Sequence, residues 1–186
     1  LEGKYLDDVL IPQMKELREE YGIAGVWIDG DCWAVAPDFS EKGKQIYGIT
    51  EDMPKRQLNQ IMHDAYLRYL QKYVNELHNY DPDFKVISNW AYTTYIPDKP
   101  TVNVDFLSGD YLHNNGVHEA RYEARGLALR DIPWDLMAWG FEATRYADKS
   151  DIQLMQEAVM TLSMGGGFQV YTMQNRDGSA RRKNFP

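Results

Sequence analysis

Two kinds of hydrophobic pattern take turns along the chain. Apolar side chains recur every three or four positions, with charged residues between them, which predicts amphipathic helices over residues 5–21, 54–78, 117–129 and 151–164. Short runs rich in apolar residues predict strands at residues 23–28, 84–90, 104–107, 136–141 and 168–171. Residues 31–53 have little periodicity and predict a long irregular connection.

The order of these elements predicts the fold class. Helices alternate with strands along most of the chain, which is typical of an α/β protein with a parallel sheet and right-handed crossovers. Five strands with no helix after the last one predict the C-terminal part of a (β/α)8 TIM barrel over residues 1–186, and a free-standing open sheet is the alternative. We expect a piece of a longer protein, because the chain begins at Leu1 without Met. Such a piece should leave Val26, Ile28 and Val170 without a full set of neighbours.

Polar and aromatic side chains gather where the predicted strands end. Asp29 follows the apolar run 23–28, and Asn89, Asp110 and Trp139 stand at or beside the ends of later runs. In α/β sheets the carboxyl ends of the strands face the ligand site. A carboxylate among tryptophans suits a sugar, because the acid can act at the anomeric carbon while the indole packs on C–H surfaces. The simpler interpretation is a turn, since Asp-Gly is a common turn pair.

Composition narrows the range of partners. The chain is 44% hydrophobic and 26% charged, as expected of a globular protein. A net charge of −8 argues against nucleic acid or anionic membrane as the main partner. The single cysteine, Cys32, excludes an internal disulfide and a multi-cysteine metal site. No apolar run reaches the roughly 18 residues of a membrane span.

Four motifs resemble one enzyme family. Residues 27–30 read Trp-Ile-Asp-Gly, and residues 105–111 read Asp-Phe-Leu-Ser-Gly-Asp-Tyr. Residues 133–141 contain Pro-Trp-Asp followed by Trp-Gly-Phe, and residues 164–178 lead from a helix through three glycines to Asp-Gly. In order and approximate spacing these resemble the C-terminal part of the catalytic barrel of retaining α-L-fucosidases, glycoside hydrolase family 29. Asp110 stands where the family usually has Glu, and Gly165–Phe168 replaces the family's Gly-Gly-Asn form.

The resemblance implies roles for particular residues. Asp29 matches the nucleophile and Asp110 the acid/base of a double displacement with two carboxylates. The residues expected to bind the carbohydrate substrate are Trp27, Asp31, Trp33, Asn89, Trp90, Tyr111, His113, Trp134 and Trp139. Two alternatives stay open: a glycosidase for a different sugar, or a catalytically inactive carbohydrate-binding barrel. We expect a secreted or periplasmic bacterial protein, with its signal peptide outside this sequence.

Other candidate groups give weaker signals. Asp31 is a rival for either carboxylate role, and Glu119, Glu123 and Glu142 are weaker candidates for the acid. His113 and His118 are five residues apart, which is a poor spacing for metal ligands, so we expect no metal and no cofactor. The three glycines precede a strand, whereas phosphate loops lead from a strand into a helix, so they predict a helix end.

Overall fold

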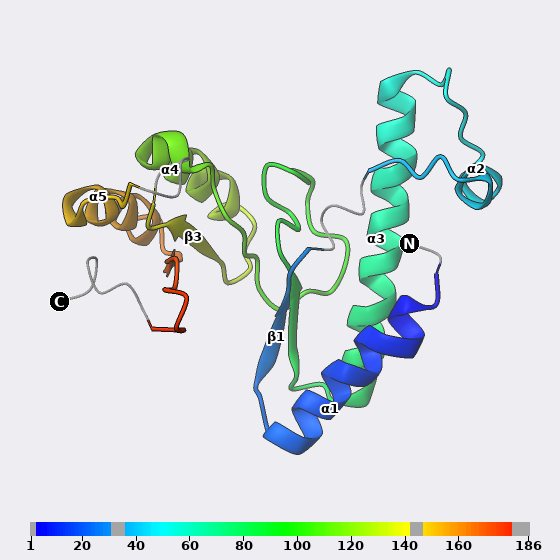
Figure 1. Ribbon diagram of the computed structural model, residues 1–186, viewed down its shortest axis with the longest axis horizontal. Helices are drawn as coiled ribbons and strands as arrows, with labels where there is room; N and C mark the ends of the chain where they lie inside the picture. The colour runs from blue at the N-terminus through cyan, green and yellow to red at the C-terminus, as the bar shows by residue number, and fades with distance from the viewer. Residues whose placement is uncertain (1–2, 31–35, 142–146, 180–186) are drawn as a thin grey trace. The chain divides into compact units, whose positions relative to one another are not determined.

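The computed structural model describes residues 3–30, 36–141 and 147–179 (Figure 1). It is a mixed α/β structure with short parallel strands in two small sheets. The chain divides into two compact units: unit 1 holds Leu1–Asn89 and Thr101–Val104, and unit 2 holds Trp90–Pro100 and Asp105–Pro186. The described residues form no complete eight-stranded barrel, and part of such a barrel over residues 1–186 stays a prediction.

Unit 1 opens with a single continuous helical stretch. A π-helical turn, η1 (Leu6–Leu10), leads directly into α1 (Ile11–Tyr21), and Pro12 is the second residue of α1. The wider π-helical turn lies just before the proline, in the part of the helix where a proline ring disturbs regular α-helical hydrogen bonding. Gly22 ends the helix in the left-handed conformation at φ 63°, which costs glycine little. The helix predicted over residues 5–21 is confirmed.

The connection after the first strand contains a helix that the sequence analysis missed. α2 (Glu41–Tyr47) begins at Ser40, whose hydroxyl accepts a hydrogen bond from the Gly43 N–H at 3.1 Å. The prediction of an irregular connection is wrong here. A helix of seven residues makes only about two turns, which is too short for a hydrophobic period to be read from sequence.

The sheet of unit 1 lies against one long helix, α3 (Lys55–Tyr80). β1 (Gly25–Ile28) pairs in parallel with β2 (Lys85–Ser88), in a register that runs from Gly25 beside Lys85 to Ile28 beside Ser88. The buried Tyr66 hydroxyl on α3 lies 2.7 Å from the Ser88 Oγ. Because alternate residues of a strand point to opposite faces, Val26, Ile28 and Ser88 face α3.

Unit 2 contains the second parallel sheet. β3 (Asp135–Trp139) pairs with β4 (Gly167–Tyr171), from Asp135 beside Gly167 to Trp139 beside Tyr171. The strand predicted at residues 104–107 is wrong as a regular strand. Instead, Leu107 and Asp110 make isolated parallel bridges to Trp134 and Met137, so residues 107–110 run along β3.

Two helices cover one face of this second sheet. A 3-10 turn, η3 (His113–Asn115), leads into α4 (Gly116–Leu127), and α5 (Asp151–Leu162) packs against α4. α5 begins with a capping box, in which the Ser150 hydroxyl accepts from the Gln153 N–H and the Gln153 side chain accepts from the Ser150 N–H. The helix start predicted at residue 151 is confirmed. Gly165, at φ 88°, follows the helix end as predicted.

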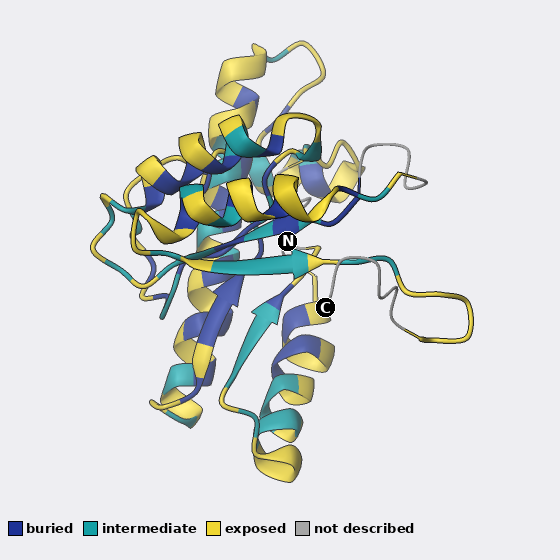
Figure 2. Cartoon of the chain, turned by 90° about the vertical axis from the view of Figure 1, so that its left-hand side faces the viewer, coloured by how far each residue is buried: buried dark blue, intermediate teal, exposed yellow. Residues whose placement is uncertain are grey.

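Burial differs between the strands. Every residue of β4 is half-buried or exposed, which Figure 2 shows as teal and yellow along that strand. Val26 and Val170 are half-buried, whereas Ile28 is buried, so the prediction that Ile28 lacks neighbours is wrong. That the chain is a piece of a longer barrel stays a prediction.

Candidate functional site

The site in unit 1 lies where both of its strands end. Asp29 follows β1 and Asn89 follows β2, so the parallel register brings the two side chains together. The Asn89 Nδ2 donates a hydrogen bond of 2.9 Å to the Asp29 Oδ1, which also accepts from the Gly30 N–H at 2.9 Å. Asn89 is buried at 2% exposure and Asp29 is exposed. A buried amide therefore orients a carboxylate that faces solvent.

Other predicted site residues of unit 1 have different outcomes. Trp27 is half-buried and lies two residues before Asp29, so both side chains are on the face of β1 away from α3. Asp31 and Trp33 lie outside the described residues.

The sheet of unit 2 has one polar face. The register places Ser108 beside Asp135 and Asp110 beside Met137. On the other side of β3, Gly167 of β4 lies beside Asp135 and Gln169 lies beside Met137. Ser108 donates to one oxygen of Asp135, and the Gln169 Nε2 donates to the other at 2.6 Å. The alternate positions, which face the helices, include Leu107, Gly109, Leu136 and Ala138, all of them buried. Polar groups therefore share the face that the helices leave uncovered.

His113 and Trp139 form a stacked pair at the carboxyl end of β3. Their ring centroids are 4.8 Å apart and the rings are 7° from parallel. Trp139 also contacts Phe141 and Tyr171, whose ring centroids lie 5.3 Å and 6.1 Å from its own. The His113 Nε2 and the Trp139 Nε1 are buried, and the described part of the chain offers neither of them a hydrogen-bond partner. His113 lies three residues after Asp110, and Trp139 lies two residues after Met137, which pairs with Asp110. The two ring nitrogens are thus candidates to bind ligand oxygens.

Tyr111 belongs to a buried network that the sequence did not reveal. Its hydroxyl donates to the Glu157 Oε2 at 2.6 Å, and the Lys149 Nζ lies 2.8 Å and 3.0 Å from the two Glu157 oxygens. Burial and the Glu157 carboxylate raise the pKa of Tyr111, so its hydroxyl stays protonated. Gly116 is required beside them, because a Cβ there would lie 2.0 Å from a Glu157 oxygen. The hydrogen bond holds Tyr111, the residue after Asp110, in place.

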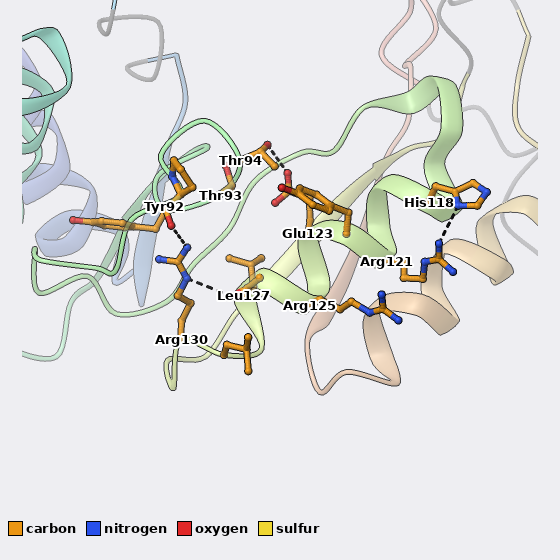
Figure 3. A pocket seen from close by; sticks show the side chains of 13 residues that line it. Tyr92, Thr93, Thr94, His118, Arg121, Glu123, Arg125, Leu127 and Arg130 are labelled. Atoms are coloured by element: carbon orange, nitrogen blue, oxygen red, sulfur yellow. Dashed lines mark hydrogen bonds between the residues drawn. The ribbon is translucent and has the colours of Figure 1, made fainter. Parts of the chain in front are cut away.

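Two pockets lie in unit 2 near α4. A small one of about 210 Å³ is lined by Trp90, Tyr95, Tyr111, Leu112, Glu119 and Glu123, among others, and is called the aromatic pocket below. A larger one of about 510 Å³ is lined by Thr94, Arg121, Tyr122, Arg125 and Arg130, among others (Figure 3). Figure 3 shows the hydrogen bond of 2.5 Å between Thr94 and Glu123. Both residues line both pockets.

The structure separates residues that the sequence had grouped. Trp90 and Tyr111 line the aromatic pocket, whose lining does not include Asp110, His113 or Trp139. Trp134 precedes β3, at the end of the strand opposite Trp139, and its ring packs over Gly166. A tryptophan at the amino end of a parallel strand is far from the strand ends that bind ligands, so its position favours a packing role.

Comparison with known proteins supplies no family. No protein-family model, curated protein or solved structure gave a match to the chain. Among the described residues, no group of three or more His, Cys, Asp or Glu side chains is arranged to hold a metal ion. Of the helices within the described ranges, none has the length and apolar character needed to cross a membrane.

Proposed function

We propose that the chain carries the catalytic carboxylates of a retaining glycoside hydrolase of the α-L-fucosidase-like kind, in a larger TIM-barrel domain. The placement of Asp29 carries the proposal. Its carboxylate is exposed at the carboxyl end of a parallel strand and is oriented by the Asn89 amide from the neighbouring strand. A carboxylate that only closed a turn would not need a buried side chain from another strand to hold it.

The polar face of unit 2 supports the same proposal independently. Asp110 lies in register with Met137, two residues before Trp139, and His113 stacks on Trp139. Carboxyl, imidazole and indole groups beside one strand end suit sugar hydroxyls and sugar C–H faces.

The proposed reaction has two steps. A carboxylate oxygen of Asp29 attacks the anomeric carbon while the glycosidic C–O bond breaks and Asp110 gives its proton to the leaving oxygen. Water then attacks the anomeric carbon of the glycosyl ester, Asp110 takes a proton from that water, and the Asp29 carboxylate leaves. Asn89 keeps the Asp29 oxygen oriented in both steps.

The direct test is covalent trapping. The chain is incubated with 2-deoxy-2-fluoro glycosyl fluorides of fucose, galactose and glucose, and its peptides are mapped by mass spectrometry. We expect one added sugar on Asp29 and none in Asp29→Asn. The sugar that labels distinguishes a fucosidase from a glycosidase for another sugar. A label on a different residue would refute the role of Asp29, and bound sugar without any label would indicate an inactive carbohydrate-binding barrel.

The role of Asp110 is tested by the choice of leaving group. Asp110→Asn should lower kcat/KM far more for alkyl glycosides, which need a protonated leaving oxygen, than for activated aryl glycosides. Equal losses on both substrates would remove the acid role from Asp110, and Glu119 and Glu142 would be examined next. A secreted or periplasmic location is part of the proposal and is testable by fractionation of the source cells.

A further inference from the structure

The aromatic pocket of unit 2 is independent of the carboxylates that are proposed to be catalytic. It measures about 210 Å³, and its lining consists of Trp90, Thr94, Tyr95, Tyr111, Leu112 and two residues of α4, Glu119 and Glu123. Pockets for drug-sized ligands typically measure about 300–1,000 Å³. The aromatic pocket therefore suits a ligand of one ring.

The backbone of Trp90 is held in a costly conformation at this pocket. Its φ is 65°, which is an outlier for a bulky side chain. The Thr93 N–H and Thr93 Oγ1 donate to the Trp90 carbonyl at 3.3 Å and 2.8 Å. Gly109 also packs closely here, since a Cβ at that position would lie 3.4 Å from the Trp90 Cα. Strained residues that are fixed by several neighbours cluster at ligand sites.

The walls of the pocket are aromatic. The Trp90 and Tyr95 rings meet edge to face, with centroids 4.4 Å apart and planes at 63°. Tyr95 is 52% exposed although its ring is large and partly apolar. Aromatic faces pack well on the C–H surface of a sugar ring, and a tyrosine hydroxyl adds a polar group at the rim.

Two carboxyl groups form the polar side of the pocket. Glu123 is buried at 5% exposure, and Thr94 donates a hydrogen bond to it at 2.5 Å. Burial raises the pKa of Glu123, which favours its neutral form, and a neutral carboxyl group can donate a hydrogen bond as well as accept one. Glu119, one helical turn earlier, is half-buried and supplies an acceptor. Acids on this side disfavour an anionic ligand.

We propose that the aromatic pocket binds one neutral pyranose unit, with Trp90 and Tyr95 against its C–H face and Glu119 and Glu123 at its hydroxyl groups. The expectation of a carbohydrate rests on the proposed function, but no catalytic step involves this pocket. It is a second sugar site, distinct from Asp110 and the His113–Trp139 pair.

Saturation-transfer NMR tests this assignment without relying on turnover. The probes are methyl α-L-fucoside, methyl β-D-galactoside and methyl β-D-glucoside, and tetramethylammonium is the cationic alternative. The protein is the Asp29→Asn chain, together with Tyr95→Ala and Glu119→Gln made in it. Tyr122→Ala is the matched control, because Tyr122 is 67% exposed on α4 and does not line the aromatic pocket.

At least one methyl glycoside should bind, and the indole N–H signal that disappears in Trp90→Phe should shift on its addition. Tyr95→Ala should weaken binding about fivefold, as expected for the loss of one aromatic contact. Glu119→Gln should weaken it by a similar factor, and Tyr122→Ala should leave it unchanged. Circular dichroism of each variant checks that it is folded.

Several results would overturn the assignment. If none of the three glycosides binds, the assignment fails, even if the chain with Asp29 intact hydrolyses aryl glycosides. Equal affinity in Tyr95→Ala and the parent would place the sugar elsewhere, and binding of tetramethylammonium alone would make the pocket a cation site. If a glycoside binds here but no hydrolysis occurs, the pocket assignment stands and the proposed catalytic function fails.

Discussion

Removing one member of the buried Lys149–Glu157–Tyr111 network should strongly destabilise unit 2. The Lys149 and Glu157 side chains are 1% and 2% exposed. Lys149→Met would leave the Glu157 carboxylate buried, with the Tyr111 hydroxyl still donating a hydrogen bond to it. Breaking a buried ion pair in this way costs about 3–5 kcal/mol. A domain is typically stable by only about 5–15 kcal/mol, so the loss is a substantial fraction of the stability of unit 2.

A double variant separates the effect of charge from that of packing. Lys149→Met/Glu157→Gln removes both charges and keeps the shape of the acid, so it should recover about 2 kcal/mol or more of the loss. Lys72→Met is the control, because the Lys72 Nζ lies 2.6 Å from the Asp7 Oδ1 in a pair that is about half exposed. An exposed pair of this kind contributes at most about 1 kcal/mol.

Urea unfolding measures these differences, and hydrogen exchange by mass spectrometry locates them. Protection should fall in peptides that cover residues 107–118 and 149–162 and should be retained in α3. A double variant as unstable as Lys149→Met would refute the electrostatic reasoning, because the loss would then come from the aliphatic stem of Lys149. A loss below about 1 kcal/mol would show that the pair is accessible to solvent.

Three further predictions concern single residues. Burial raises the pKa of Glu123 above its ordinary value of 4.5, so near this pH the folded state binds more protons than the unfolded state. The contribution of Glu123 to stability should therefore fall as the pH rises above 4.5. Urea midpoints between about pH 4 and 8 should show this fall for the parent and lack it for Glu123→Gln. Gly25→Ala would place a Cβ 2.5 Å from the Lys85 carbonyl oxygen, so unfolding should become easier by about 1–3 kcal/mol in thermal melts, and an unchanged melt would contradict the close approach of β1 and β2. Asn89→Ala should lower kcat on activated glycosides about tenfold or more while leaving KM nearly unchanged, whereas equal changes in both would indicate that Asn89 binds substrate instead.

The regular elements could be predicted from sequence where the hydrophobic period is long. α3, with 26 residues, and α5, which begins at a capping box, are close to the predicted ranges. The segment 104–107 shows the limit. Its apolar residues are real core positions, since Val104 and Leu107 are buried, but isolated bridges replace the predicted strand. Apolar runs indicate burial more reliably than they indicate strand geometry.

The candidate site was predictable only in part, and the reason is physical. Asp29 and Asn89 each follow an apolar run, so parallel pairing alone predicts that they meet. Glu157 stands in a helix where a charged residue is normally solvated, and its burial depends on Lys149 eight residues earlier and Tyr111 from another segment. On the same helix Ile152, Met155 and Val159 are more than half exposed. No periodicity predicts such an exchange of buried and exposed positions.

The polar groups of unit 2 differ between the two ends of its sheet, and the difference separates structural roles from binding roles. At the start of β3, Asp135 accepts hydrogen bonds from Ser108 and Gln169, so that cluster satisfies itself and stabilises the pairing of its neighbours. At the end of β3, the buried ring nitrogens of His113 and Trp139 have no partner within the described residues. The Trp139 Nε1 is a donor, whereas the His113 Nε2 is a donor or an acceptor depending on its tautomer, and a buried polar group without a partner costs about 1–3 kcal/mol. Under the proposed function, these two ring nitrogens at the carboxyl end of β3 are the groups that substrate oxygens would complete.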